Sequence, residues 1–202
     1  MSPTGSDRAK NADLEDLSAL LHADALAVMS EWAATSAEAD EARRQTLELL
    51  STGPVAVTRA HRPGHVTAST LIVGEDGRVL LCLHGRMKMW MQVGGHCEQE
   101  DATLALAALR EATEESGISG LKLDPEPIDV HIHPVRCRPA DGEPATQTHH
   151  YDVRFLAVAP AGAVERISDE SSALGWFAPD ALPTPLADGV RSQLTPAFAR
   201  LG

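Results

Sequence analysis

Aromatic side chains are scarce in this sequence: three Trp, one Tyr and three Phe make up 3% of its 202 residues. We therefore expect few surfaces on which nucleobases could stack, and a core built mainly from Ala, Leu and Val. The sequence also lacks a run of about 18 apolar residues, the length that a membrane-spanning helix needs. Its first 20 residues carry several charges and no apolar segment, which is not the pattern of a secretory signal peptide.

Positive charge is in short supply as well, because 17 Lys and Arg stand against 29 Asp and Glu, for a net charge of −12. Such a surface repels a phosphate backbone, so we expect no nucleic acid polymer as a partner. A small phosphorylated substrate can still bind if divalent cations lie between protein and phosphate. The three cysteines, Cys82, Cys97 and Cys137, include no C-x-x-C pair and predict no disulfide framework. A soluble, cytoplasmic protein without membrane attachment is the expectation.

The first quarter of the chain has a different pattern of apolar residues from the rest. We expect residues 1–10 to be disordered and residues 14–50 to form two helices, because leucines and other apolar residues recur there with helical spacing. The Ser-Thr-Gly-Pro cluster at residues 51–54 ends the second helix. Residues 1–55 are therefore predicted to be an N-terminal helical extension. It should pack on the main domain or on a second subunit, so a homodimer is one expectation.

The remaining residues, 56–202, are predicted to form a single domain of mixed strands and helices, an α/β or α+β fold. The Asp76-Gly77 pair indicates a hairpin turn between two apolar runs. We expect strands at 65–73, 78–84, 90–93, 128–135, 149–159 and 174–177, helices at 101–116 and 187–201, and a loop at 136–148.

Three glutamates in the predicted helix at 101–116 carry the chemistry. Glu111, Glu114 and Glu115 occupy positions i, i+3 and i+4, and Glu115 falls at the edge of the apolar face. Carboxylates at this spacing repel one another, and negative charge is unfavourable near a helix C-terminus. Hard divalent cations such as Mg²⁺, with Mn²⁺ as a substitute, would compensate, since they bind carboxylate oxygens and leave positions for phosphate oxygens and water.

The residues around these glutamates fit the same interpretation. Arg110 can hold one carboxylate through a bidentate pair. The Gly94-Gly95 pair allows the backbone to turn and to approach a ligand closely. Gly117 is well placed to end the helix in the left-handed conformation.

This segment resembles the signature of the Nudix hydrolases, which is Gly, five residues, Glu, seven residues, then Arg-Glu-aliphatic-any-Glu-Glu-any-Gly-aliphatic. The second half matches in full from Arg110 to Ile118. The first half departs twice, because Asp101 stands for the first Glu and the spacing from it to Arg110 is one residue longer. A one-residue insertion before the helix explains both departures. The resemblance covers residues 60–185.

The resemblance implies a fold and a site. The fold is an α/β/α sandwich with a mixed sheet. The metal would be held by Glu111, Glu114 and Glu115, with the Gly95 carbonyl as a further ligand.

Several other residues are candidates for the site. Glu98 and Glu170, together with Asp101, are candidate extra ligands or bases supplied by loops. His96 lies inside the glycine loop and is a candidate for substrate contact. Arg86 and Lys88 could contact phosphates, although solvated hairpin charges are an equally good interpretation.

The predicted strands contain several histidines. His131 and His133 alternate on one strand, and His149 and His150 begin another. A zinc site is conceivable, but no Cys/His spacing in the sequence indicates one, and structural or solvent-facing histidines are favoured.

Together these features predict a hydrolase that uses water to cleave a diphosphate linkage in a nucleoside diphosphate derivative. Glu111 could serve as metal ligand or as base. The alternative is a Nudix-like sensor that binds a nucleotide without cleaving it, and the three retained glutamates argue against it. A prenyl diphosphate isomerase on the same fold would need a catalytic cysteine with a second acid, an arrangement that the sequence does not show.

Overall fold

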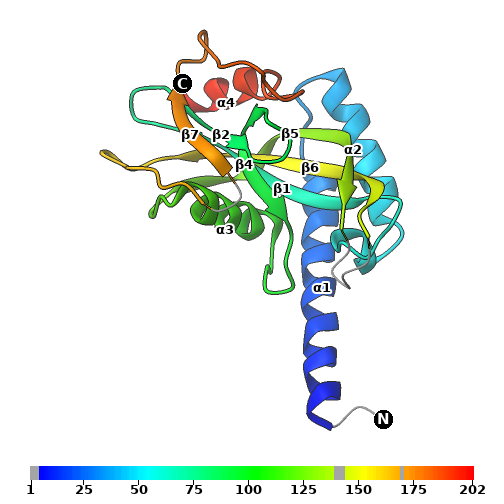
Figure 1. Cartoon of the computed structure of the whole chain (residues 1–202). Helices are drawn as coiled ribbons and strands as arrows, with labels where there is room; N and C mark the ends of the chain where they lie inside the picture. Colours follow the sequence, from blue (N-terminus) through cyan, green and yellow to red (C-terminus); the bar gives the residue numbers. More distant parts are fainter. Residues whose placement is uncertain (1–4, 139–143, 169–170) are drawn as a thin grey trace.

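The computed structural model describes residues 5–138, 144–168 and 171–202 (Figure 1). The chain begins with two α-helices, α1 (Gly5–Glu31) and α2 (Ala37–Leu50), followed by the short 3₁₀ helix η1 (Pro54–Val57). Helix α1 therefore begins inside residues 1–10, which were expected to be disordered. Ser36 begins α2 as its N-cap, since its hydroxyl accepts a hydrogen bond from the Ala39 N–H at 3.1 Å.

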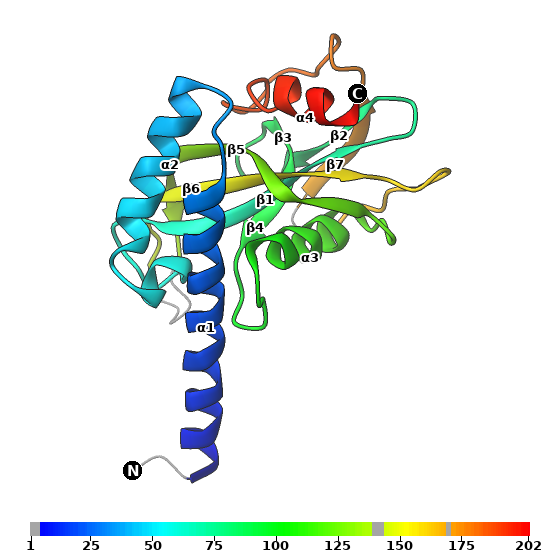
Figure 2. The same cartoon turned by 180° about the vertical axis from the view of Figure 1, so that it is seen from behind.

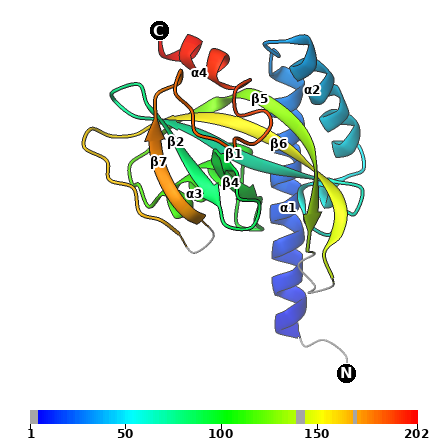
Figure 3. The same cartoon turned by 45° about the horizontal axis from the view of Figure 1, so that its top comes forward.

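A seven-stranded mixed sheet forms the centre of the molecule (Figure 3). Its main order is β3-β2-β1-β6-β5, with β4 paired to β1 and β7 paired to β2. The β1–β6 pair is parallel and every other named pair is antiparallel. The strands are β1 (His65–Val73), β2 (Val79–His84), β3 (Trp90–Met91), β4 (Val93–His96), β5 (Lys122–Cys137), β6 (Thr146–Val158) and β7 (Ser171–Phe177).

Helices cover both faces of the sheet. Helix α3 (Leu104–Ser116) lies on one side and α4 (Leu194–Leu201) on the other, as Figures 1 and 2 show. Successive side chains of β1 and β6 point to opposite faces of the sheet. Val66 and Ala68 join Val153 and Phe155 in the core under α3. The prediction of an α/β/α arrangement with a mixed sheet is confirmed.

The N-terminal helices share this core. Leu21, Ala25 and Met29 recur every four residues along α1 and are buried, as is Trp32 directly after the helix. They belong to the same apolar cluster as Phe155 of the sheet. The N-terminal half of α1 continues beyond the sheet, away from the rest of the molecule (Figure 1). Among the described residues, no helix combines the length and the apolar character needed to cross a membrane.

Several expected boundaries were wrong by a few residues. Helix α3 begins at Leu104 instead of Asp101, because Thr103 is its N-cap and accepts from the Leu106 N–H at 3.1 Å. Strands β5 and β6 pair far into the segment expected to be a loop at 136–148. The last helix begins at Leu194 rather than at residue 187.

Adjacent leucines of α1 provide a matched test of whether this helix is part of the core. Leu21 is 2% exposed and Leu20 is 58% exposed. We expect Leu21→Ala to lower the free energy of unfolding by about 2–5 kcal/mol, because it leaves a cavity in a shared core. Leu20→Ala should change it by no more than about 0.5 kcal/mol. Urea unfolding of both variants measures this, and an effect of Leu21→Ala as small as the one expected for Leu20→Ala would show that α1 does not stabilise the domain.

Candidate functional site

The three glutamates lie on the side of α3 that faces strand β4. Glu115 accepts a hydrogen bond from the backbone N–H of Gly94 at 2.9 Å. The side chain of Glu111 is largely covered, whereas that of Glu114 is 60% exposed. One of these carboxylates, Glu111, is therefore largely buried, and another, Glu114, is open to solvent.

The glycine pair of β4 makes this close approach of helix and strand possible. A Cβ atom on Gly95 would lie 2.7 Å from the carboxylate carbon of Glu111 and from both of its oxygens. A Cβ atom on Gly94 would lie 2.3 Å from the Cβ of Ser69 on β1. The pair thus belongs to a strand rather than to a free turn, and the lack of side chains leaves room for the glutamate on one side and for β1 on the other.

Arg110 connects the parts of the site. Its guanidinium donates two hydrogen bonds to Asp101, at 3.1 and 2.8 Å, and one to the carbonyl of His96 at 3.0 Å. It also donates to Glu111 at 3.1 Å and to Glu114 at 3.2 Å. Asp101 first, and Glu111 after it, raise the pKa of Arg110, so its positive charge is permanent.

Asp101 is held in this arrangement by several contacts. Its side chain is 5% exposed, and both of its oxygens accept hydrogen bonds from Arg110. Its Oδ2 atom also accepts from the backbone N–H of Glu98 at 2.8 Å. In this arrangement Asp101 orients Arg110 and fixes the loop that carries Glu98.

A pocket of about 460 Å³ opens beside the glutamates. Carboxylates of Glu98, Glu111 and Glu114 lie on its walls, and Arg86 lies there too. Arg110 also lines the pocket, together with three arginines that the sequence did not single out, Arg59, Arg136 and Arg138. Acidic groups near guanidinium groups suit a ligand that carries phosphates together with divalent cations.

The remaining candidates are placed differently. Lys88 is not among the lining residues; it lies in the turn between β2 and β3 with φ 56°. Glu170 lies outside the described residues. A larger pocket, of about 970 Å³, lies between α2, β5 and α4, and it contains none of the α3 glutamates.

The sequence did not lead us to expect a buried polar network on the sheet face toward α4. Asp152 accepts hydrogen bonds from Ser69 at 2.8 Å and from Arg154 at 3.0 Å, and Arg154 donates to Asp129 at 3.2 Å. Burial alone would raise the pKa of Asp152, but the Arg154 guanidinium and the Ser69 hydroxyl outweigh it and lower that pKa. The signal in the sequence was the alternation of polar residues along both strands, at 65, 67 and 69 and at 150, 152 and 154.

His96, the candidate for substrate contact, lines the pocket, and its ring lies close to other polar side chains. Its Nε2 atom lies 3.2 Å from the Cys137 sulfur. The rings of His65 and His150 lie 5.2 and 4.9 Å from the His96 ring, centre to centre. Burial lowers the pKa of His65 to about 4, of His96 to about 2 and of His150 to about 3. All three imidazoles are therefore neutral at pH 7.

Comparison with known proteins identifies the same family at the level of sequence. A sequence model described as the NUDIX domain matches residues 63–198. A MutT-like protein of Streptomyces ambofaciens is 28% identical over 137 residues, which cover 68% of this chain and 79% of that protein.

Solved structures agree in fold. The crystal structure of a MutT NUDIX hydrolase from Burkholderia pseudomallei is 31% identical, with a TM-score of 0.50 over 65% of this chain and 96% of that chain. A C. elegans Ap4A hydrolase binary complex is 20% identical, with a TM-score of 0.53 over 67% of this chain and 96% of that chain.

Two carboxylates that share Arg110 allow a matched test of the arrangement. We expect Asp101→Asn to lower the free energy of unfolding by about 1–3 kcal/mol, because the partly buried guanidinium of Arg110 loses its most buried charged partner. Glu114→Gln removes an exposed partner and should change this free energy by no more than about 0.5 kcal/mol. Urea unfolding at neutral pH measures both variants. A larger effect of Glu114→Gln would contradict the central position given to Asp101.

Proposed function

The chain belongs to the Nudix hydrolase family, and we propose that it cleaves a diphosphate linkage in a nucleoside diphosphate derivative by attack of water on phosphorus. The observation that carries this proposal is the pocket beside α3. Carboxylates of Glu111 and Glu114 line it together with the guanidinium groups of Arg59, Arg86 and Arg136. A diphosphate bound there would contact the arginines directly and the carboxylates through cations.

The residues present fit a hard divalent cation, Mg²⁺ or Mn²⁺. Glu111, Glu114 and Glu115 offer carboxylate oxygens within one and a half turns of α3. Gly95 lies against the Glu111 carboxylate, and its backbone carbonyl would be a further oxygen ligand. The space that the missing Gly95 side chain leaves is filled by the Glu111 carboxylate itself. A bound cation would neutralise charge on the phosphate oxygens and lower the pKa of a coordinated water.

The protein groups have separate tasks in this scheme. Arg110 keeps the carboxylates of Glu111 and Glu114 in place, so that they do not swing apart under mutual repulsion. The Gly94 N–H orients Glu115 in the same way. Glu111 acts as a cation ligand or as the base that takes the proton of the attacking water. Glu98 lies at the pocket wall and is a second candidate for the base.

A sensor that binds a nucleotide without cleaving it is the alternative. The full set of glutamates beside the arginine-lined pocket favours hydrolysis over binding alone. Three free cysteines also agree with the cytoplasmic location that we expect, and a homodimer stays a prediction.

Phosphate release from a panel of substrates tests the function. The panel contains nucleoside triphosphates, ADP-ribose and dinucleotide polyphosphates such as Ap4A, each assayed with and without Mg²⁺ in the presence of a phosphatase. We expect turnover that needs the cation and falls by a factor on the order of 100 or more in Glu115→Gln. Cation-dependent nucleotide binding without turnover of any compound would establish the sensor instead.

Replacement of the glycine pair separates catalysis from stability. We expect Gly95→Ala to lower kcat/KM by a factor on the order of 100, because the new methyl group displaces the Glu111 carboxylate. Its melting temperature should stay close to that of the wild type, since a flexible side-chain end can move aside.

Gly94→Ala is the matched control for Gly95→Ala. Its new methyl group would meet Ser69 and the backbone of Ala68, so it should mainly lower the melting temperature. Full activity of Gly95→Ala on the substrate that the panel identifies would rule out the position assigned to Glu111.

A further inference from the structure

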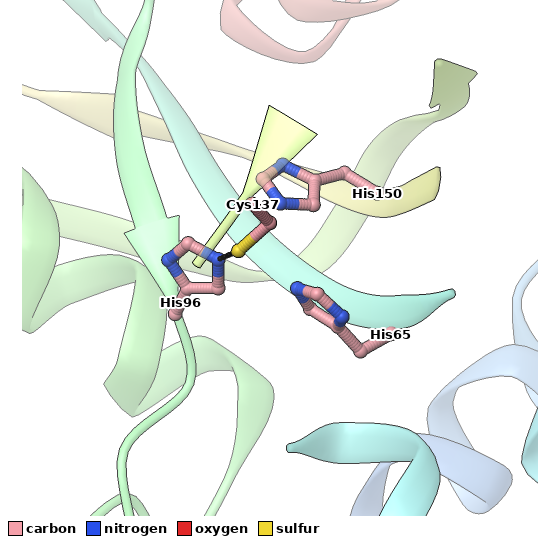
Figure 4. A group of neighbouring side chains, drawn as sticks. All are labelled: His65, His96, Cys137 and His150. Atoms are coloured by element: carbon pink, nitrogen blue, oxygen red, sulfur yellow. Dashed lines mark hydrogen bonds between the residues drawn. The ribbon is translucent and has the colours of Figure 1, made fainter. Parts of the chain in front are cut away.

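Four potential metal ligands from four different strands meet near one end of the sheet (Figure 4). His65 begins β1, His96 ends β4, Cys137 ends β5 and His150 lies in β6. One ligand atom from each side chain can be chosen so that all four lie within 4.8 Å of one another. Strand pairing produces the cluster, because His65 is the direct partner of His150 in the parallel β1–β6 ladder.

The cluster contains buried polar atoms that lack partners. His65 is 1% exposed, and neither of its ring nitrogens makes a hydrogen bond with the described residues. The Nε2 atom of His150 is likewise buried and without such a bond. An unsatisfied buried polar atom costs about 1–3 kcal/mol, so a protein rarely keeps several together without a ligand.

We propose that His65, His96, Cys137 and His150 bind a transition-metal ion of the zinc class. This ligand set is distinct from the α3 glutamates, although His96, Cys137 and His150 line the same pocket as Glu111 and Glu114. Three imidazole nitrogens and one sulfur are the donors that Zn²⁺ and Co²⁺ prefer, whereas Mg²⁺ prefers oxygen. Four protein ligands fill a tetrahedral shell, which is the arrangement of a structural site.

The distances suit such an ion after a small contraction. Bonds of about 2.0–2.1 Å to nitrogen and about 2.3 Å to sulfur place tetrahedral ligand atoms roughly 3.3–3.8 Å apart. The His96 nitrogen and the Cys137 sulfur are already 3.2 Å apart, and the other ligand atoms need to move by about 1 Å. The Cys137 thiol releases its proton to solvent when the metal–sulfur bond forms, and the ion with its thiolate keeps one net positive charge.

A metal at this position would influence the neighbouring pocket. Cys137 lies between Arg136 and Arg138, and all three line the pocket beside α3. An anchored Cys137 would restrict the backbone that carries both arginines, and so would favour substrate binding. This consequence rests on the proposed function, whereas the metal site itself does not.

Titration with Co²⁺ tests the site without any assay of activity. The full-length protein is first treated with a chelator and a thiol reductant, and it is then titrated in excess Mg²⁺, which occupies carboxylate sites. We expect one equivalent of Co²⁺ to produce the visible bands of a tetrahedral ion and the near-ultraviolet band of a cobalt–thiolate bond. Zn²⁺ should displace Co²⁺ and raise the melting temperature.

Variants with matched controls identify the ligands. Cys137→Ser, at a half-exposed position, should abolish the cobalt–thiolate band, and His150→Gln should weaken binding by a factor on the order of 100. His149→Gln, next to His150 but exposed, and Cys82→Ser, in a different part of the core, should bind as the wild type does.

The metal site and the proposed hydrolysis can fail independently. Glu115→Gln should keep the cobalt spectrum even though it loses turnover. Absence of stoichiometric binding in the wild type, or a thiolate band that survives in Cys137→Ser, would overturn the proposal.

Discussion

The arrangement of the site depends on the guanidinium of Arg110. Three carboxylates at positions 111, 114 and 115 would repel one another near the end of α3, where the helix dipole opposes negative charge. Arg110 counters this repulsion, since it contacts Glu111 and Glu114 while Asp101 holds it from the other side. Its bond to the His96 carbonyl also ties the helix to strand β4. Helix, strand and loop are thus held together by the charge of Arg110, which is partly buried.

The parallel pairing of β1 and β6 determines which side chains lie on each face of the sheet. Side chains alternate along both strands, so that one face is apolar and is covered by α1 and α3. Toward their N-terminal ends the opposite face is polar, with His65 on β1 and His150 and Asp152 on β6. The glycine pair of β4 lies against β1, where it brings the carboxylates of α3 within reach of this polar end. The pocket and the His/Cys cluster are therefore neighbours because they share the same strands.

Local spacing made much of the site predictable. The helix that carries Glu111, Glu114 and Glu115 was anticipated because its apolar and acidic residues follow a period of 3.6, and Gly117 ends it as expected with φ 66°. The start of the helix was placed three residues too early, at Asp101, because its N-cap is Thr103. Asp101 lies in the loop before α3 and closes that loop onto Arg110, which a count of residues could not reveal.

The sequence alone determined the family resemblance, the mixed α/β class and the glutamate face of α3, because each depends on residues close together in the chain. Only the tertiary structure decided that Arg59, Arg136 and Arg138 line the same pocket as those glutamates. It also brought His65, His96, Cys137 and His150 together, although as many as 85 residues of sequence separate them. The physical reason is that strand pairing joins distant segments in a register that depends on the whole sheet, and spacing along the chain carries no record of it.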